Sequence, residues 1–294
     1  MTGSSRITRR RTLGILYREE SDKGLTHPFF VLILNAFLAE AEKRGYDAAF
    51  LSHPLKEGYE TLADHCVRAG VDGLCLVCTD FAHPQVKALM AGAFPCVSVD
   101  HIFRGKPAVL SDNETGVRKL VEFAIARGHR RIAMIHGHNN SLVTRTRISQ
   151  FKNTMEYHRL PVPDAFLREG RYHDIGGTRN LVNQMLTLPE APSCILLPDD
   201  MTYFGAQEAA RDCGLKIPDD ISFAGYDGIP LTQALKPRLT TIRQNAETLG
   251  KVAAARLMDL IEHPETAPKR PAIYPVELLE GETVAPFRPE AARP

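Results

Sequence analysis

The chain has 294 residues, a formal net charge of +1, and a composition that is 44% apolar and 24% charged. This length is sufficient for two lobes that each have a hydrophobic core, and the composition is ordinary for a globular protein. A net charge so close to zero provides no overall attraction to nucleic acid or to an anionic membrane. The bulk numbers therefore argue against a dedicated nucleic-acid-binding or membrane-surface protein.

No apolar run approaches the ~20 residues that span a bilayer, and no export signal precedes Leu13. We therefore expect a cytoplasmic protein with no membrane partner. The six cysteines lack the spacing of a disulfide scaffold, so reduced thiols are expected. Cys75 and Cys78 form a C-x-x-C, but residues three apart on one strand point to opposite faces, which disfavours a shared metal ion.

The first third of the chain alternates apolar runs with amphipathic segments. Strands are expected at Thr12–Tyr17, Tyr46–Leu51, Leu74–Cys78 and Cys96–Val99, and helices at Phe29–Arg44, Tyr59–Ala69 and Pro84–Ala91. A glycine follows each helix, at the position where a left-handed residue commonly ends one. This repetition predicts a parallel sheet with helices on both faces.

The pattern then restarts. Helices are expected at Thr115–Arg127, Thr146–Tyr157, Ile175–Leu186 and Tyr203–Cys213, and strands at Arg131–Ile135, Phe166–Glu169, Ser193–Leu197 and Ile221–Gly225. The chain thus holds a second lobe of similar α/β architecture. The helical stretch Ala246–Glu262 is expected to pack back on the first lobe, and the strand-like stretch Ala272–Leu279 to return to the second. Several crossings would create a hinge with a cleft between the lobes.

Two neighbouring strands of the second lobe end in carboxylates. Asp199 and Asp200 follow one strand, and Asp227 follows the next. Ligands of parallel α/β folds bind just outside the carboxyl ends of the strands, so these acids indicate a small-molecule site. We expect Asp200 to cap the helix that follows it.

Several short blocks, in one order along the chain, resemble those of the lactose-repressor/purine-repressor (LacI/GalR) family of transcription regulators. They are T-H-P-F-F at 26–30, V-D-G-L at 71–74, V-D-H at 99–101, D-N-E-T-G at 112–116, G-H-R-R-I at 128–132, P-D-D-M at 198–201, I-P-D-D-I-S at 217–222 and L-T-T-I-R-Q at 239–244. The resemblance implies a periplasmic-binding-protein-like pair of lobes, a homodimer and a small effector bound between the lobes. The lobes are expected at 12–111 plus 243–273 and at 112–242 plus 274–287, with a linker at 1–11 and a frayed tail at 288–294.

Members of this family carry a helix-turn-helix headpiece ahead of the first strand, and only MTGSSRITRR precedes it here. Ten residues cannot form that headpiece, so contact with operator DNA is expected only through a headpiece absent from this sequence. The arginines Arg6, Arg9, Arg10 and Arg11 resemble the end of the linker, and the alternative is a solvated tail. The sequence is then a truncated chain, a short gene product or a protein that lacks a DNA reader.

The resemblance also implies the residues of an effector site. Arg147 begins an R-x-x-x-F that is similar to the family's R-x-x-G-F, whose arginine binds the effector. Asp227 matches the first acid of the family's G-[FY]-D-D, and Gly228 replaces the second. The alternatives are a surface salt bridge for Arg147 and a helix cap for Asp227. Asp199 stands where the family has asparagine; because a carboxylate only accepts hydrogen bonds, this change favours a ligand rich in donors.

Aromatic residues are expected to complete the site. Tyr172 aligns with an aromatic position that stacks on the effector in some members, while Phe29 and Phe30 would line the first lobe with Asp100 beside them. Aromatic faces with polar groups at their edges suit a sugar or a base ring. The predicted ligand is therefore carbohydrate-like, with a related polar metabolite or a nucleoside as alternatives. Each aromatic residue taken alone is more often part of a core.

No motif indicates catalysis. The chain lacks G-x-G-x-x-G, P-loop, G-x-S-x-G and H-E-x-x-H patterns, and His136 and His138 have no nearby third metal ligand. We therefore expect no enzyme activity, no catalytic residues, no cofactor and no bound metal. The leading hypothesis is the effector-sensing and dimerising core of a LacI-type regulator, and the rival is a free-standing sugar-binding or solute-binding protein of a transport system. The coding sequence upstream of Met1 distinguishes them, as a helix-turn-helix or as an export signal.

Overall fold

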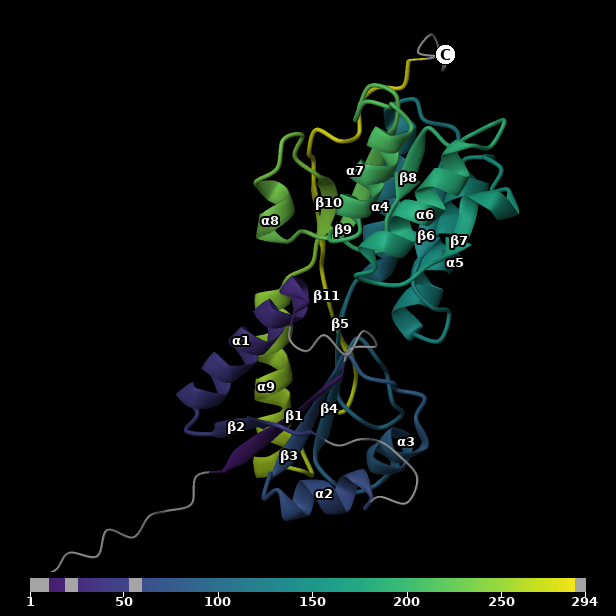
Figure 1. Cartoon of the computed structure of the whole chain (residues 1–294). Coiled ribbons are helices and arrows are strands. Elements are labelled where there is room, and N and C mark those ends of the chain that lie inside the picture. The colour runs from purple at the N-terminus through teal and green to yellow at the C-terminus, as the bar shows by residue number, and fades with distance from the viewer. Residues whose placement is uncertain (1–10, 19–25, 53–59, 289–294) are drawn as a thin grey trace, which may run out of the picture. The chain divides into compact units, whose positions relative to one another are not determined.

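The computed structural model describes residues 11–18, 26–52 and 60–288, and Figure 1 traces them. The expected linker up to Arg10, the first residue of the helix expected from Tyr59, and the tail at 289–294 lie outside the described residues. The chain divides into two compact units. Unit 1 comprises Met1–Leu110 and Ala246–Tyr274, and unit 2 comprises Ser111–Asn245 and Pro275–Pro294. The chain thus crosses between units after residues 110, 245 and 274, where the sequence placed the boundaries after 111, 242 and 273.

Unit 1 contains a six-stranded sheet in the order β11-β5-β4-β3-β1-β2. The pairs β1–β2, β1–β3, β3–β4 and β4–β5 are parallel. Its strands are β1 (Thr12–Tyr17), β2 (Asp47–Phe50), β3 (Gly73–Val77), β4 (Cys96–Val99), β5 (Ala108–Ser111) and β11 (Ala272–Tyr274). Its helices are α1 (Pro28–Lys43), α2 (Leu62–Arg68), α3 (Pro84–Ala91) and α9 (Ala246–Glu262).

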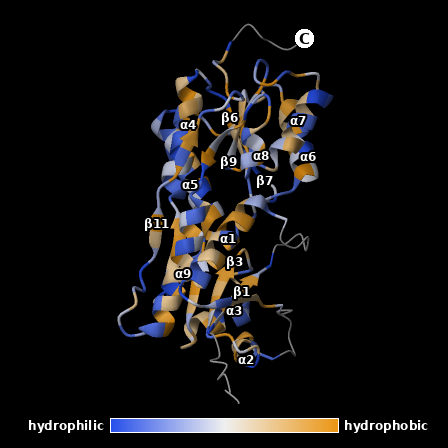
Figure 2. Ribbon diagram, turned by 90° about the vertical axis from the view of Figure 1, so that its left-hand side faces the viewer, coloured by the Kyte–Doolittle hydropathy of each residue, from blue (hydrophilic) through white to orange (hydrophobic). Residues whose placement is uncertain are grey.

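Alternate residues of β3 explain why helices cover both faces of this sheet. Leu74 and Leu76 are buried in a cluster with residues of α2 and α3. A Cβ added at Gly73, on the opposite face, would lie 2.9 Å from side chains of α9. The strands β1 and β3 are accordingly among the most hydrophobic parts of the ribbon (Figure 2). The expected packing of α9 on the first lobe is found, because α9 lies against α1 and contacts β3 and β4.

Unit 2 repeats this design with the order β12-β10-β9-β8-β6-β7. Only β12, of the pairs described, runs antiparallel to its neighbour β10. Its strands are β6 (Ile132–His136), β7 (Leu167–Glu169), β8 (Cys194–Leu196), β9 (Ser222–Asp227), β10 (Thr240–Arg243) and β12 (Glu277–Leu279). Its helices are α4 (Asn113–Ala126), α5 (Leu142–Tyr157), α6 (Ile175–Leu186), α7 (Tyr203–Asp212) and α8 (Pro230–Gln233), with a 3₁₀ turn at Asp164–Phe166.

Two hydrophobic clusters lie on opposite faces of this second sheet. One joins α4 and α5 to residues such as Met134 and Leu196, and the other joins α6 and α7 to residues such as Ile135 and Ile195. Neighbouring residues of β6 and of β8 therefore belong to different clusters, as alternation along a strand requires. The predicted α/β architecture, with parallel sheets flanked by helices, is confirmed.

The structure differs from the sequence prediction at a few elements. The strand-like stretch Ala272–Leu279 forms two strands, β11 in unit 1 and β12 in unit 2, so only its second part belongs to unit 2. Pro275 lies between the two strands, and a residue without an N–H cannot continue a ladder. Helix α5 begins four residues earlier than expected, because the Ser141 hydroxyl accepts a hydrogen bond from Thr144 N and caps it. The strands β5 and β10 and the short helix α8 were not predicted.

All six cysteines are free. Cys75 is buried in β3, where burial raises the pKa of its thiol, whereas Cys78 lies beyond the end of that strand. The same cause raises the pKa of Cys66, Cys96 and Cys194 to about 12. These four thiols are therefore protonated and unreactive at neutral pH.

Candidate functional site

In unit 2 the polar residues singled out from the sequence gather at one edge of the sheet. The strands β6, β8 and β9 are parallel neighbours, so their carboxyl ends meet there. Asp199 and Asp200 follow β8, and Asp227 is the last residue of β9. The crevice outside such strand ends is where α/β proteins bind small ligands.

Arg147 is the central cation of this edge. It lies on α5 and only 6% of its surface is exposed, which rules out the alternative of a surface salt bridge. Its Nε donates a hydrogen bond to Asn113 Oδ1 at 2.7 Å, and its Nη1 donates to the carbonyl oxygen of Pro198 at 3.1 Å. Its guanidinium carbon lies 3.5 Å from the centroid of the Tyr226 ring, which is a close cation–π contact. The guanidinium is thereby fixed in one orientation.

Tyr172 also lies near this guanidinium, with its ring centroid 5.9 Å from the Arg147 carbon. Its hydroxyl shares a hydrogen bond of 2.9 Å with the Thr144 hydroxyl, one turn before Arg147 on α5. A Cβ at Gly137 would lie 2.1 Å from the Tyr172 ring, so the ring can occupy this place only because residue 137 is glycine. Burial raises the pKa of Tyr172, which therefore stays a neutral phenol.

A small cavity of about 10 Å³ lies among these groups, with Arg147, Tyr172, Tyr226, His136 and Pro198 in its wall. A cavity of that size holds about one water molecule. The side chains of Arg147 and the two tyrosines therefore fill most of this part of unit 2 themselves.

Asp199 and Asp200 have different structural roles from those expected. Asp199 accepts hydrogen bonds from Thr202 N at 2.9 Å and from His173 N at 2.6 Å, one on each oxygen. Asp200 accepts from Ile229 N, Thr232 Oγ1 and Thr241 Oγ1 at 2.9, 2.8 and 2.5 Å. The prediction that Asp200 caps the helix after β8 is wrong, because α7 has no side-chain cap and Asp200 instead ties β8 to β10 and α8.

Asp227 has an unusual backbone conformation, with φ of 120°. Residues other than glycine rarely adopt this region, and such strain concentrates at functional sites. Its Oδ1 accepts a hydrogen bond of 2.7 Å from Gln244 Nε2. It does not cap α8, whose first turn lacks a side-chain cap. At the next residue a Cβ would lie 2.6 Å from Arg243, and φ is 70°, which explains why Gly228 replaces the second acid of the family pattern.

The three buried acids share one electrostatic environment. Burial, and then the charges of Asp200 and Asp199, raise the pKa of Asp227 well above its ordinary value, although Arg147 and Gln244 oppose this. Burial likewise raises the pKa of Asp199, and it raises that of Asp200 to about 7. Removing carboxylates from water disfavours their charged form, and neighbouring acids add to that effect. This edge of unit 2 is therefore rich in acceptors and short of positive charge.

The remaining predicted site residues belong to unit 1. Phe29 and Phe30 occupy the first turn of α1, where Phe29 is 3% exposed and packs in the core. Phe30 is less buried and lies edge-on to Tyr17 and His27, at ring centroid distances of 5.8 and 4.9 Å. Asp100 follows β4 with φ of 62°, and its N–H donates to the Val109 carbonyl at 3.0 Å.

Three residues of the unit 2 site were not predicted as such. Asn113 and Gln244 orient Arg147 and Asp227, and Tyr226 supplies the face beneath the guanidinium. Asn113 and Gln244 belong to the D-N-E-T-G and L-T-T-I-R-Q blocks. Their position in these family blocks is the sequence feature that could have identified them as site residues. Nothing in the sequence pairs either with its charged partner, because 34 and 17 residues separate them.

Among the described residues no group of three or more His, Cys, Asp or Glu side chains is placed to hold a metal ion. His138 instead pairs with Glu169 at 2.8 Å, and His136 with the Gly137 carbonyl at 2.7 Å. Within the same described part of the chain, no helix has both the length and the apolar character for crossing a bilayer.

Comparison with known proteins places this geometry in a family. Residues 121–284 match the model of the periplasmic binding protein-like domain. The chain belongs to that family. It is 27% identical over 237 residues to the HTH-type transcriptional repressor PurR of Haemophilus influenzae, covering 80% of this chain and 70% of the relative. It is 28% identical over 258 residues to the ribose operon repressor of Escherichia coli, covering 85% of this chain and 75% of the relative.

A solved structure shares this fold. A LacI family transcriptional regulator from Enterococcus faecium, solved with bound ribose, has a TM-score of 0.81 and 24% identity, and the match covers 95% of this chain and all of that one. The expected resemblance is therefore confirmed, and the chain is an effector-binding core of LacI/GalR type. The relatives are transcriptional repressors.

Proposed function

We propose that this protein senses a small carbohydrate-like effector through the Arg147–Asp227 edge of unit 2, and that this binding controls a LacI-type transcription regulator. The protein acts as a homodimer and reaches operator DNA through a headpiece of the kind that the family resemblance implies. The names of the ribose operon repressor and of the ribose-bound regulator support a sugar as the effector class.

One observation carries the proposal. Arg147 is buried, stacked on Tyr226 and held by two neutral acceptors, in the same strand-end edge as the strained Asp227. A guanidinium fixed in this way presents a planar set of donors, which suits vicinal hydroxyls, and Asp227 supplies an acceptor for the same ligand. Arg147 would thus donate hydrogen bonds to the ligand, and Asp227 would accept them from it. A salt bridge kept only for stability would not require the strained backbone at Asp227.

The test begins with a thermal-shift screen of sugars, sugar acids and nucleosides, because a ligand that binds the folded state raises the unfolding temperature. For the ligand found, Arg147→Ala and Asp227→Ala should each weaken binding by at least about a hundredfold in isothermal titration, since hydrogen bonds to charged groups contribute about 1.5–3 kcal/mol each. Arg147→Lys should also lose most of the affinity, because lysine lacks the planar fork.

Arg145→Ala is the matched control, because Arg145 is exposed on the same helix. It should bind as the wild type does. Unchanged affinity in both Arg147→Lys and Asp227→Ala, with both variants folded, would rule out this site.

A further inference from the structure

The acids Asp199, Asp200 and Asp227 differ in how many of their carboxylate oxygens already accept hydrogen bonds from the protein. This difference identifies the acid that can accept one from a ligand. Both oxygens of Asp199 and both oxygens of Asp200 accept hydrogen bonds from the protein. Asp227 receives its bond on Oδ1 alone, and no described residue donates to Oδ2. Asp227 is therefore the acid of this cluster that still has an oxygen for a donor on the ligand.

Gln244 provides a second acceptor beside it. Its backbone N–H donates to the Asp227 carbonyl at 3.1 Å, and its Nε2 donates to Asp227 Oδ1, so its side chain is held in place. Gln244 is 5% exposed, and its buried Oε1 has no hydrogen-bond partner among the described residues. Because Oε1 and Nε2 share one carbon atom, this oxygen lies next to the Asp227 carboxyl. A buried acceptor without a donor costs about 1–3 kcal/mol, so this arrangement favours a donor supplied from outside.

The charges at this edge distinguish between possible donors. Asp199, Asp200 and Asp227 interact electrostatically, and Arg147 is the cation that acts on Asp227. The hydrogen bonds described for Arg147 go to the neutral oxygens of Asn113 and Pro198. A hydroxyl donates one proton and brings no charge. An ammonium group has three N–H donors, has no acceptor to satisfy, and brings the missing positive charge.

Resting on the function proposed above, we propose that the effector carries a protonated amino group, as an amino sugar does, and that this group binds Asp227 Oδ2 and Gln244 Oε1. Asp227 supplies the charge recognition. Gln244 is a positioning residue for Asp227 and also a second acceptor. Arg147 and the tyrosines then contact the hydroxyls and the ring of the same ligand.

The test compares sugars that differ only by an amino group in place of a hydroxyl. The affinities of D-glucosamine and D-glucose, and of D-galactosamine and D-galactose, are measured by isothermal titration at neutral pH. In at least one pair the amino sugar should bind about tenfold more tightly or better, the ratio that corresponds to about 1.4 kcal/mol. Asp227→Asn should abolish that preference, and Gln244→Met should reduce it. Asp219→Asn, an exposed acid in the same unit, should leave it unchanged.

The outcomes separate this inference from the proposed function. If the neutral sugar binds as tightly as its amino partner, or if Asp227→Asn weakens both members of a pair equally, the amino group is not recognised and the inference fails while sugar sensing stands. If no sugar binds either in the thermal-shift screen or in these titrations, carbohydrate sensing fails and the inference fails with it.

Discussion

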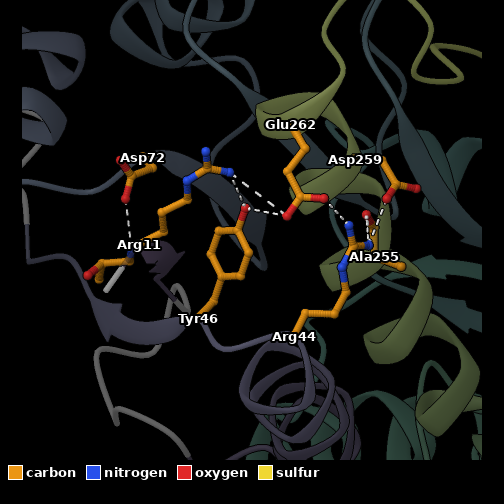
Figure 3. A network of polar contacts seen from close by, with 8 residues as sticks. Arg11, Arg44, Tyr46, Asp72, Ala255, Asp259 and Glu262 are labelled. Atoms are coloured by element: carbon orange, nitrogen blue, oxygen red, sulfur yellow. Dashed lines mark hydrogen bonds and ion pairs between the residues drawn. The ribbon is translucent and has the colours of Figure 1, made fainter. Parts of the chain in front are cut away.

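Two arginine-centred networks, one in each unit, use the same kinds of residue in opposite ways. In unit 1, Arg44 donates to Asp259 at 2.7 Å and to Glu262 at 2.5 Å, and Figure 3 shows these contacts at the surface of α9. The Tyr46 hydroxyl donates to Glu262 at 2.9 Å and accepts from Arg11 at 3.1 Å. In unit 2, the described hydrogen bonds of Arg147 go to neutral oxygens, and the acids beside it are buried.

The acids of the two networks respond differently. Although burial opposes the change, hydrogen bonds from Tyr46 and Arg44 lower the pKa of Glu262. Burial raises the pKa of Asp227, and the neighbouring acids raise it further. The network of unit 1 thus pairs charged side chains that are partly exposed, so water also stabilises their charged forms. The cluster of unit 2 buries acids whose charged form the fold disfavours, and such perturbed groups are common in binding sites.

The largest effect on stability is expected at Asp200. Replacing it by alanine leaves Ile229 N, Thr232 Oγ1 and Thr241 Oγ1 without their acceptor in a buried place. Asp200→Ala should therefore lower the free energy of unfolding by about 3 kcal/mol, combining lost hydrogen bonds with a small cavity. Denaturant unfolding against the exposed control Asp219→Ala measures this. A loss no larger than that of the control would show that Asp200 does not tie β8 to β10 and α8.

The smallest effect is expected in the unit 1 network. Glu262→Gln removes the charge that Arg44 and Tyr46 contact, yet exposed ion pairs contribute only about 0–1 kcal/mol and are weakened by salt. The variant should lose less than about 1 kcal/mol, and the loss should shrink at high salt. Glu247→Gln, which breaks the pair with Lys251 on the same helix, is the matched control. A loss above about 2 kcal/mol would mean that the two networks do not differ as described.

The sequence predicted the helices and strands of both sheets closely, because local signals mark them. Gly45, Gly70 and Gly214 adopt positive φ after their helices, as expected, whereas Gly92 after α3 has φ of -79°. Helices α6 and α9 have the predicted limits, and the Asp174 side chain marks the start of α6 by accepting a hydrogen bond from Gly177 N. The strands β5 and β10 and helix α8 were missed. The residues of β10 and α8 carry no comparable alternation and are placed by contacts to β9 and Asp200, and the short β5 is placed by its pairing with β4.

The site was less predictable than the fold. Arg147 and Asp227 could be named from motifs, but the acceptors and the ring that hold Arg147 come from residues far along the chain, namely Asn113, Pro198 and Tyr226. The helix cap expected of Asp200 was wrong, because only the fold decides which donors an acid meets, and the donors to Asp200 lie in α8, just before it and in β10. Sequence spacing contains no information about that choice.

One measurement tests the difference between the two networks most directly. The thermal unfolding midpoints of the wild type and of Asp227→Asn are measured at pH 5 and pH 8, with and without the ligand from the thermal-shift screen. A carboxyl whose pKa is raised in the folded state contributes stability below its unfolded pKa, and that stability is lost as pH rises through the folded pKa. Without ligand, the variant should therefore be the more stable of the two at pH 8, and the difference should be smaller at pH 5, which is closer to the ordinary aspartate pKa of about 3.9. With ligand, the wild type should gain clearly more stability than the variant. A variant that is less stable than the wild type at pH 8 without ligand would contradict the account, because Asp227 would then be serving the fold and not the ligand.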